Sequence, residues 1–254
     1  MFELNGKAII VTGGGRGIGK GISTVLARQG ARVAIADLLQ EEAESTVAEI
    51  KAAGGEAMAI KTDVTDFDQV KAMVSAVIKA YGQVDVLVNN VGWDKMMPFI
   101  KTTPDFWDKI IAINYKGALN CCYAVLEDMV PRNAGKIINI SSDAARVGSM
   151  GEAVYSGAKG AIISFSKTLA REVARNKINV NVVCPGPTST PLVEDMMTES
   201  SFAKKVLSGM ERIIPLGRMG MPEDLGHAVA FLATEEASFI TGQVLSVSGG
   251  LTMA

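Results

Sequence analysis

Seven short apolar runs recur along the chain, and most of them are rich in β-branched side chains. A run that is apolar on both faces is typical of a strand buried inside a parallel sheet. We therefore expect strands at residues 8–11, 32–36, 57–60, 84–88, 136–140, 178–183 and 243–247.

Helical patterns separate these runs. Apolar residues recur every three or four positions after Thr65 and Asp66, either of which is a suitable N-cap. Thr103-Pro104 predicts a helix start, with the helix ending near residue 130, before Pro131. Further helices are expected over residues 152–175 and from Pro222 onward.

Strands that alternate with helices predict the α/β class. We expect a single-domain Rossmann-type doubly wound sheet over residues 1–254, with seven parallel strands and helices on both faces. One irregular segment, residues 185–220, contains four prolines and several methionines. An irregular segment this long inside a domain is more often functional than idle, so we expect it to form a substrate lid.

Composition excludes several classes of protein. The chain has 254 residues, of which 48% are hydrophobic and 20% charged, so it is not a disordered protein. Its net charge of −2 argues against nucleic acid or an anionic membrane as a partner. Three Cys and one His leave little for a metal site, and we expect none. No signal peptide or membrane span is visible, and we expect a cytoplasmic protein with reduced thiols.

A glycine-rich loop follows the first predicted strand and opens a helix. It reads Thr12-Gly13-Gly14-Gly15-Arg16-Gly17-Ile18-Gly19. Glycine permits the tight turn and the close approach of a pyrophosphate, and the helix N-terminus offers free N–H groups to phosphates. In this context the loop predicts a dinucleotide site.

Asp37, which ends the second predicted strand, decides between the two nicotinamide dinucleotides. A carboxylate there can accept hydrogen bonds from ribose hydroxyls and repels a 2′-phosphate. Its neighbours Leu38 and Leu39 supply no cation. Arg16 is the counter-argument, because a guanidinium in the loop is able to reach a 2′-phosphate. The balance predicts NAD as the cofactor.

Tyr155 and Lys159 lie four residues apart on a predicted helix, so they share one face. An ammonium group near a phenol lowers the pKa of the phenol, and an oxidised nicotinamide adds a second positive charge. A phenol with its pKa lowered in this way is able to act as a base. The pair alone is uninformative, because the same spacing occurs on many solvated helices.

Several motifs occur together in one order and spacing that resembles the short-chain dehydrogenase/reductase family over essentially the whole chain. They are Thr12-Gly13-x-x-x-Gly17-Ile18-Gly19, Asn89-Asn90-Val91-Gly92, Asn114, Ser142, Tyr155-x-x-x-Lys159 and Pro185-Gly186-x-x-x-Thr190. Val91 departs from the family, which usually has Ala at this position.

The resemblance implies a direct hydride transfer without a metal. It implies that Tyr155 is the acid–base group, that Lys159 lowers its pKa and holds the nicotinamide ribose, and that Ser142 positions the reacting oxygen. Asn114 would support a water-linked proton path. The implied cofactor contacts are Gly13, Arg16, Gly17, Ile18, Gly19, Asp37, Asp63, Val64, Asn90, Gly92, Tyr155, Lys159, Pro185, Gly186, Thr188 and Thr190. The implied substrate contacts are Trp93, Ser142, Val147, Met150, Tyr155 and Pro187.

Within the family, stretches such as Gly92-Trp93-Asp94 and residues 142–148, 181–188 and 241–253 are similar to dehydrogenases of alicyclic β-hydroxyacyl-CoA thioesters. The implied reaction is the oxidation of a secondary alcohol such as 2-hydroxycyclohexanecarboxyl-CoA to the ketone. Arg146 and Lys95 are candidates to meet CoA phosphates, but the sequence favours surface solvation as the explanation of each.

Three other functions stay open. One is a 3-oxoacyl-(acyl-carrier-protein) reductase, for which NADPH is the usual cofactor and Asp37 an obstacle. Another is a dehydrogenase of aryl or other cyclic secondary alcohols. The third, a non-catalytic NAD-binding sensor, would not need Ser142, Tyr155 and Lys159 together. The family resemblance also implies a homotetramer that pairs helices near 104–130 and 152–175.

Overall fold

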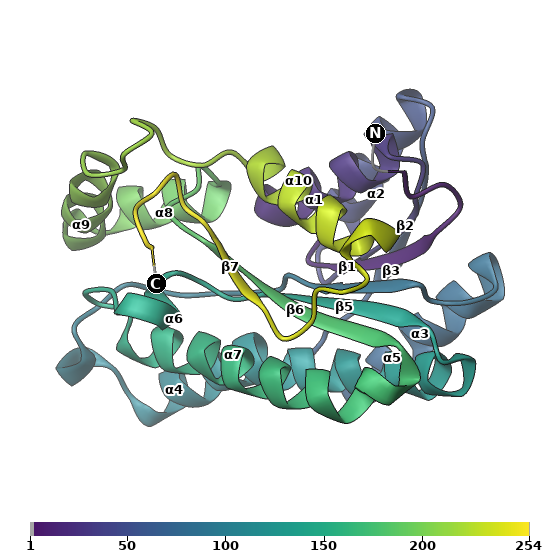
Figure 1. Cartoon of the computed structure of the whole chain (residues 1–254). Helices are drawn as coiled ribbons and strands as arrows, with labels where there is room; N and C mark the ends of the chain where they lie inside the picture. Colours follow the sequence, from purple (N-terminus) through teal and green to yellow (C-terminus); the bar gives the residue numbers. More distant parts are fainter. Residues whose placement is uncertain (1–2, 254) are drawn as a thin grey trace.

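A sheet of seven parallel strands runs through the middle of the protein (Figure 1). The computed structural model describes residues 3–253. The strands are β1 (Ala8–Thr12), β2 (Arg32–Asp37), β3 (Glu56–Lys61), β4 (Val86–Asn89), β5 (Gly135–Ile140), β6 (Ile178–Pro185) and β7 (Val244–Val247). Their order in the sheet is β3-β2-β1-β4-β5-β6-β7. The predicted α/β class and all seven strands are confirmed, with shifts of one or two residues at the strand ends.

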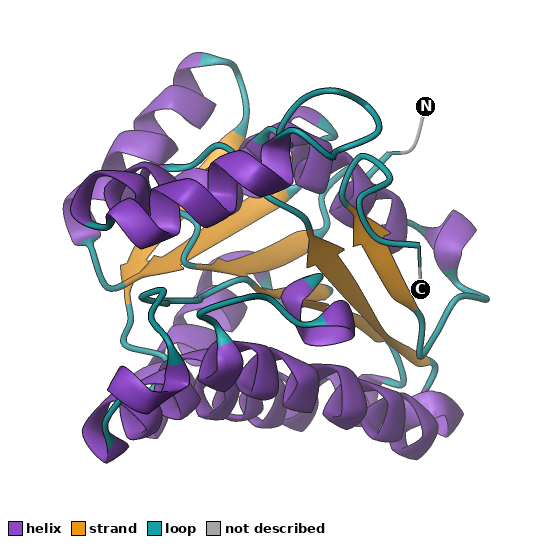
Figure 2. Cartoon of the chain, turned by 90° about the vertical axis from the view of Figure 1, so that its left-hand side faces the viewer, coloured by secondary structure: helices purple, strands orange, loops and turns teal. Residues whose placement is uncertain are grey.

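Helices cover both faces of the sheet, as predicted (Figures 1 and 2). One face packs against α1 (Gly17–Arg28), α2 (Gln40–Ala52) and α10 (Pro222–Ala233). The other packs against α3 (Phe67–Tyr81), α5 (Gly117–Arg132) and α7 (Ala153–Val173). Along β1, Ile9 and Val11 belong to the first core and Ile10 to the second. This alternation is why the strands are apolar on both faces.

The predicted starts of two helices are confirmed. The Asp66 side chain accepts hydrogen bonds from the backbone N–H groups of Asp68 and Gln69 and caps α3. Thr103 caps α4 (Pro104–Ile111), in which Pro104 takes the first position. Both caps satisfy N–H groups that have no partner inside the helix.

The helix predicted from Thr103 to residue 130 differs in two ways. A π-helical turn, Ala112–Lys116, separates α4 from α5. The Asn114 amide lies within this turn and donates to the carbonyl oxygen of Ile110, so a side chain takes a backbone acceptor there. The prediction that the helix ends before Pro131 was wrong. The chain stays helical through Arg132 and ends where Asn133 adopts a left-handed conformation.

The segment 185–220 is more regular than predicted. It contains two helices, α8 (Pro191–Glu199) and α9 (Ser201–Glu211), capped by the side chains of Thr190 and Ser200. Their apolar side chains pack around Met96 in a third, small core. The helices rise beside the carboxyl ends of the strands, at the upper left of Figure 1. Both helices are short, and the sequence analysis did not identify them.

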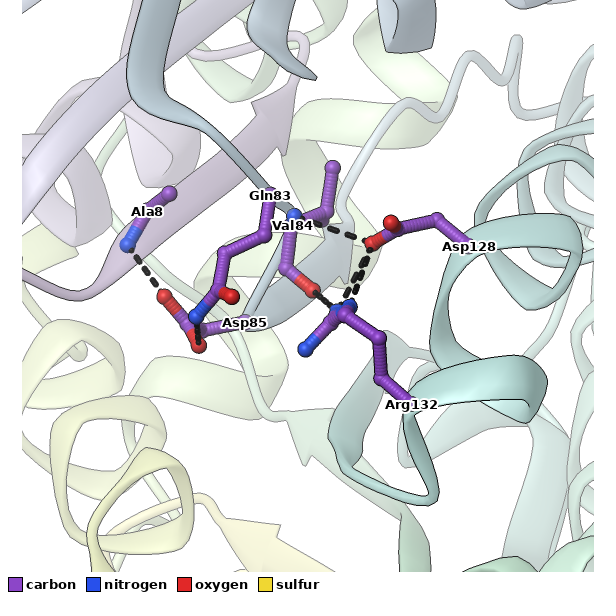
Figure 3. Close-up of polar contacts among 6 residues, drawn as sticks. All are labelled: Ala8, Gln83, Val84, Asp85, Asp128 and Arg132. Atoms are coloured by element: carbon purple, nitrogen blue, oxygen red, sulfur yellow. Dashed lines mark hydrogen bonds and ion pairs between the residues drawn. The ribbon is translucent and has the colours of Figure 1, made fainter.

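A polar cluster holds together the amino ends of the central strands β1 and β4 (Figure 3). Asp85 accepts from the backbone N–H of Ala8 at 2.8 Å and so ties the start of β4 to β1. Asp128 accepts from the N–H of Val84 at 3.1 Å and from Arg132 at 2.7 Å, while Arg132 donates to the carbonyl oxygen of Val84 at 2.6 Å. These bonds hold α5 against the sheet at the amino ends of the strands. Ligand sites of such sheets lie at the other end, outside the carboxyl ends of the strands.

No helix within residues 3–253 is both long enough and apolar enough to cross a membrane.

Candidate active site

A cleft of about 970 Å³ opens at the carboxyl ends of the strands. It lies where the strand order reverses between β1 and β4, which is where open α/β sheets bind ligands. The loops that follow β1, β2, β3, β4, β5 and β6 all contribute lining residues. The volume suits a large organic ligand.

The glycine loop is built for a close approach of backbone to ligand. Gly13 and Gly17 have φ angles of 62° and 52°, which side-chain-bearing residues rarely adopt. A Cβ atom on Gly19 would lie 1.9 Å from the carbonyl oxygen of Gly13, so only glycine fits there. Asn90, which directly follows β4, holds the glycine loop in place. Its Nδ2 donates to the carbonyl oxygens of Thr12 and Gly13, each at 3.0 Å.

The start of α1 at the end of this loop carries no side-chain cap. Its first N–H groups therefore face the cleft without a side-chain acceptor, and the helix dipole makes this end partly positive. These features fit the pyrophosphate of a dinucleotide.

Asp37 is buried at the end of β2. One carboxylate oxygen accepts from the N–H of Gly15 and the other from the N–H of Leu39, each at 3.0 Å. Arg16 is exposed and forms no ion pair with Asp37 within the described part of the chain. The anionic charge of Asp37 is therefore presented to the cleft without a neutralising partner.

The predicted catalytic residues converge on one side of the cleft. Ser142 follows β5, and Tyr155 and Lys159 lie on α7. The Lys159 side chain is buried; its Nζ donates to the carbonyl oxygen of Ile140 at 3.0 Å and to that of Val91 at 3.5 Å. The same Nζ lies 5.9 Å from the centre of the Tyr155 ring.

Asn114 lies behind this group and does not line the cleft. Its Oδ1 accepts from the N–H of Trp93 at 3.1 Å, and its Nδ2 donates to the carbonyl oxygen of Trp93 at 2.8 Å. A Cβ atom on Gly92 would lie 3.2 Å from Asn114 Oδ1 and 3.3 Å from Lys159 Nζ. Asn114 thus clamps the loop that carries Trp93 and comes close to Lys159 across Gly92.

The protein's own groups keep Tyr155 protonated. Burial raises the pKa of Tyr155 above its usual value, and the charges of Glu152 and Asp94 raise it further, whereas a hydrogen bond with Ser142 lowers it. Burial also lowers the pKa of Lys159 to about 8. Tyr155 is therefore ready to act as an acid, and its use as a base requires positive charge near the phenol.

The cleft brings together nearly all of the predicted site residues. Every residue proposed for the cofactor lines it, and so do Trp93, Ser142, Val147 and Pro187. Met150 does not line the cleft, and 69% of its surface is exposed. Arg146 is engaged elsewhere in the protein, donating to Ser246 Oγ at 2.6 Å.

Besides Asp143, three charged residues of the cleft were assigned no role from the sequence. Asp94, Lys109 and Glu152 line its wall near Trp93 and Tyr155. Lys109 Nζ lies 3.9 Å from the centre of the Trp93 ring. Their positions along the chain follow no spacing pattern, and only the folded loops bring them together.

Comparison with known proteins agrees with this geometry. A family model described as "Enoyl-(Acyl carrier protein) reductase" matches residues 13–252. The chain belongs to the short-chain dehydrogenase/reductase family. As a member of that family it is an oxidoreductase that acts on CH–OH donors with a nicotinamide cofactor.

Relatives in the family cover nearly the whole chain. A 3-oxoacyl-[acyl-carrier-protein] reductase of Thermotoga maritima is 37% identical over 99% of this chain and 100% of its own length. The reductase of the same name from Staphylococcus aureus is 40% identical, over 97% of this chain and 98% of its own. The oxidoreductase UcpA of Salmonella typhimurium is 38% identical, over 100% and 97% of the two chains.

The buried ammonium of Lys159 should cost folding stability. Replacing it with Met (Lys159→Met) removes a charge that burial disfavours, so we expect the free energy of unfolding at pH 7 to rise by more than about 1 kcal/mol. The gain should be constant below pH 8, where folded and unfolded lysine are both protonated. It should shrink between pH 8 and pH 10.5, because the folded lysine escapes the cost of a buried charge by losing its proton while the unfolded lysine keeps it.

Urea unfolding at several pH values measures this effect. Lys167→Met, an exposed lysine on the same helix, is the matched control and should change stability by less than about 0.5 kcal/mol. A destabilised Lys159→Met protein at pH 7, or a gain that stays equal up to pH 10.5, would contradict the explanation.

Proposed function

We propose that this protein is an NAD-dependent oxidoreductase that interconverts a β-hydroxyacyl thioester and the corresponding β-oxoacyl thioester. The observation that carries the proposal is the convergence of Ser142, Tyr155 and Lys159 on a cleft that a dinucleotide-type glycine loop also lines. The reductases it is similar to are named for 3-oxoacyl thioesters on acyl carrier protein, which supports this substrate class.

The chain's own residues would perform the acid–base part of the reaction. In the reductive direction Tyr155 donates its phenolic proton to the carbonyl oxygen, and in the oxidative direction it takes the proton of the hydroxyl. The Ser142 hydroxyl donates to the same oxygen and fixes its position. A bound nicotinamide would supply or accept the hydride. Lys159, held by Val91 and Ile140, favours the phenolate when the proton leaves.

Different parts of the cleft would bind different parts of the cofactor. The glycine loop and the start of α1 would hold the pyrophosphate, and Asp37 the adenosine ribose. Asp63 and Val64 would contact the adenine, while Asn90, Gly92, Pro185, Gly186, Thr188 and Thr190 would line the nicotinamide half. Because Asp37 repels a 2′-phosphate, we propose NAD and not NADP.

One wall of the acyl half of the cleft is apolar. Met96, Met196, Leu207 and Met210 line it beside Trp93. Methionine adapts to irregular apolar groups, so this wall suits an aliphatic or alicyclic acyl chain. The only support for the alicyclic substrate 2-hydroxycyclohexanecarboxyl-CoA is the sequence resemblance to 2-hydroxycyclohexanecarboxyl-CoA dehydrogenase. The names of the relatives favour an open-chain 3-oxoacyl group instead. The two share the β-hydroxyacyl thioester, which is the part that we propose.

A homotetramer remains part of the proposal. Ile110 and Ile162, which lie on the helices expected at the subunit contacts, are buried within the protomer. Ile111 is 45% exposed on α4, and Tyr123 is 61% exposed on the adjoining α5. An exposed apolar surface on this helical face suits contact with a second copy.

The function is tested with 3-oxobutyryl thioesters of CoA, acyl carrier protein and N-acetylcysteamine, assayed with NADH. We expect turnover of the thioesters and much slower reduction of simple cyclic ketones that lack an acyl group. Tyr155→Phe should lower kcat by at least 10³-fold and leave NADH binding, followed by fluorescence, nearly unchanged. Tyr81→Phe, which changes a tyrosine on α3 outside the cleft, is the control. Turnover confined to simple alcohols and ketones would refute the thioester proposal.

Cofactor choice gives a second test. Wild-type protein should show a kcat/KM with NAD at least tenfold above that with NADP, and Asp37→Asn should narrow the ratio at least tenfold, which corresponds to about 1.4 kcal/mol. Asn keeps an acceptor for the N–H of Gly15 but removes the charge. Asp68→Asn, an exposed carboxylate on α3, should leave the ratio unchanged. A wild-type preference for NADP would refute the assignment.

A further inference from the structure

Two carboxyl side chains, Asp94 and Glu152, lie beside Tyr155 in the acyl half of the cleft. Asp94 belongs to the loop after β4, and Glu152 comes directly before α7. A hydrogen bond of 2.9 Å from the N–H of Met97 to the carbonyl oxygen of Gly151 joins their two segments. The carboxyls are therefore fixed parts of the wall that faces the substrate.

Asp94 is 95% buried, and its Oδ2 receives no hydrogen bond. Neither carboxyl takes part in an ion pair within residues 3–253. The Glu152 carboxyl reaches Asp94, but two carboxyls can bond only when a proton lies between them. A small pocket behind them, also lined by Tyr155, has no room for a water molecule. Water and ligand groups therefore reach the pair from the cleft side.

The electrostatics around the pair are negative. Burial raises the pKa of Asp94 to about 8, the charge of Glu152 adds to this rise, and burial raises the pKa of Glu152 as well. The two nearby ammonium groups keep their charge, but neither contributes to the pKa shift of Asp94 or Glu152. Lys159 binds the carbonyl oxygens of Ile140 and Val91, and Lys109 lies over the Trp93 ring.

The other ionisable groups near Tyr155 do not reverse this sign. Burial raises the pKa of Cys184 on β6 to about 11, so this thiol is uncharged at neutral pH. The Asp143 carboxylate after β5 and the Arg146 guanidinium carry opposite charges and both bond to Ser246, and Ser142 is uncharged. Tyr155 itself responds to the pair, because the charges of Asp94 and Glu152 raise its pKa. The wall next to the reacting oxygen thus carries one negative charge when the pair holds a proton and two when it does not.

We propose that Asp94 and Glu152 are specificity residues that form a charge filter, rejecting substrates whose acyl group is a free carboxylate and admitting the neutral thioester or ester. This inference rests on the proposed function, because the substrate must be a β-hydroxyacyl compound. In such a compound a single carbon atom separates the acyl carbon from the carbinol carbon, so the acyl group lies close to Tyr155. A carboxylate at that place would meet the buried pair with little water to screen the repulsion. A thioester carbonyl carries no charge and meets none of this repulsion.

The test compares 3-hydroxybutyrate with its N-acetylcysteamine thioester, each oxidised with NAD. We measure the ratio of kcat/KM for the thioester to that for the free acid. Asp94→Asn and Glu152→Gln keep the size of the side chains and remove the charge, so each should lower the ratio at least tenfold, mainly by faster oxidation of the free acid. Any change in the Tyr155 pKa acts on both substrates and cancels in the ratio.

Two controls make the outcome specific. Asp108→Asn removes an exposed carboxylate on α4 outside the cleft and should leave the ratio unchanged. NADH binding, followed by fluorescence, shows that each variant is folded, and the two variants test the filter independently.

The pH dependence separates a charge filter from a merely structural role. In the wild-type protein the ratio should rise between pH 7 and pH 9, because the shared proton leaves near pH 8 while 3-hydroxybutyrate stays ionised. In either variant the ratio should rise much less over the same range, because only Lys159, whose pKa is about 8, still changes its charge near the reacting centre.

An unchanged ratio in both variants, with thioester turnover intact, would overturn the filter and leave the proposed function standing. A wild-type protein that does not oxidise the thioester at all would overturn both.

Discussion

The buried ammonium group of Lys159 is the interaction on which the site depends. It is held by carbonyl oxygens that follow β4 and end β5, so the loop that carries Gly92, the end of the central sheet and α7 meet at one atom. Burial of that charge lowers the pKa of Lys159 and costs stability. The destabilising buried charge lies at the carboxyl ends of the strands, where the strand order reverses. The polar cluster of Asp85, Asp128 and Arg132 stabilises the amino ends of the central strands.

The acid–base chemistry of the cleft follows from opposing charges. Lys159 lies close to the Tyr155 ring, while Glu152 and Asp94 raise the pKa of the phenol. The protein's own groups thus favour the protonated tyrosine, which is the form that gives a proton to a carbonyl. Positive charge in the cleft is needed for the opposite step. The two carboxyls that raise the pKa of Tyr155 also make the acyl half of the cleft negative. In our proposal the same residues therefore affect both the proton transfer and the selection of the substrate.

The sequence predicts those features that depend on local patterns. The strands follow from β-branched runs, the start of α3 from Asp66, and the dinucleotide-type loop from glycines placed between a strand and a helix. Helices α8 and α9 escaped prediction because they are short and lie in a segment interrupted by several prolines. The continuation through Pro131 and the π turn at Asn114 depend on tertiary contacts. Asp94 and Glu152 lie 58 residues apart, and nothing in their local sequence shows that the fold places both beside Tyr155.

The central claim is that positive charge in the cleft turns the Tyr155 phenol into a base. Ultraviolet titration of tyrosinate in wild-type protein, with the Tyr155→Phe titration subtracted, isolates this group from Tyr81, Tyr115 and Tyr123. In saturating NAD we expect the difference signal to titrate well below pH 10, and without NAD only above it. A difference signal that titrates above pH 10 under both conditions would contradict the account.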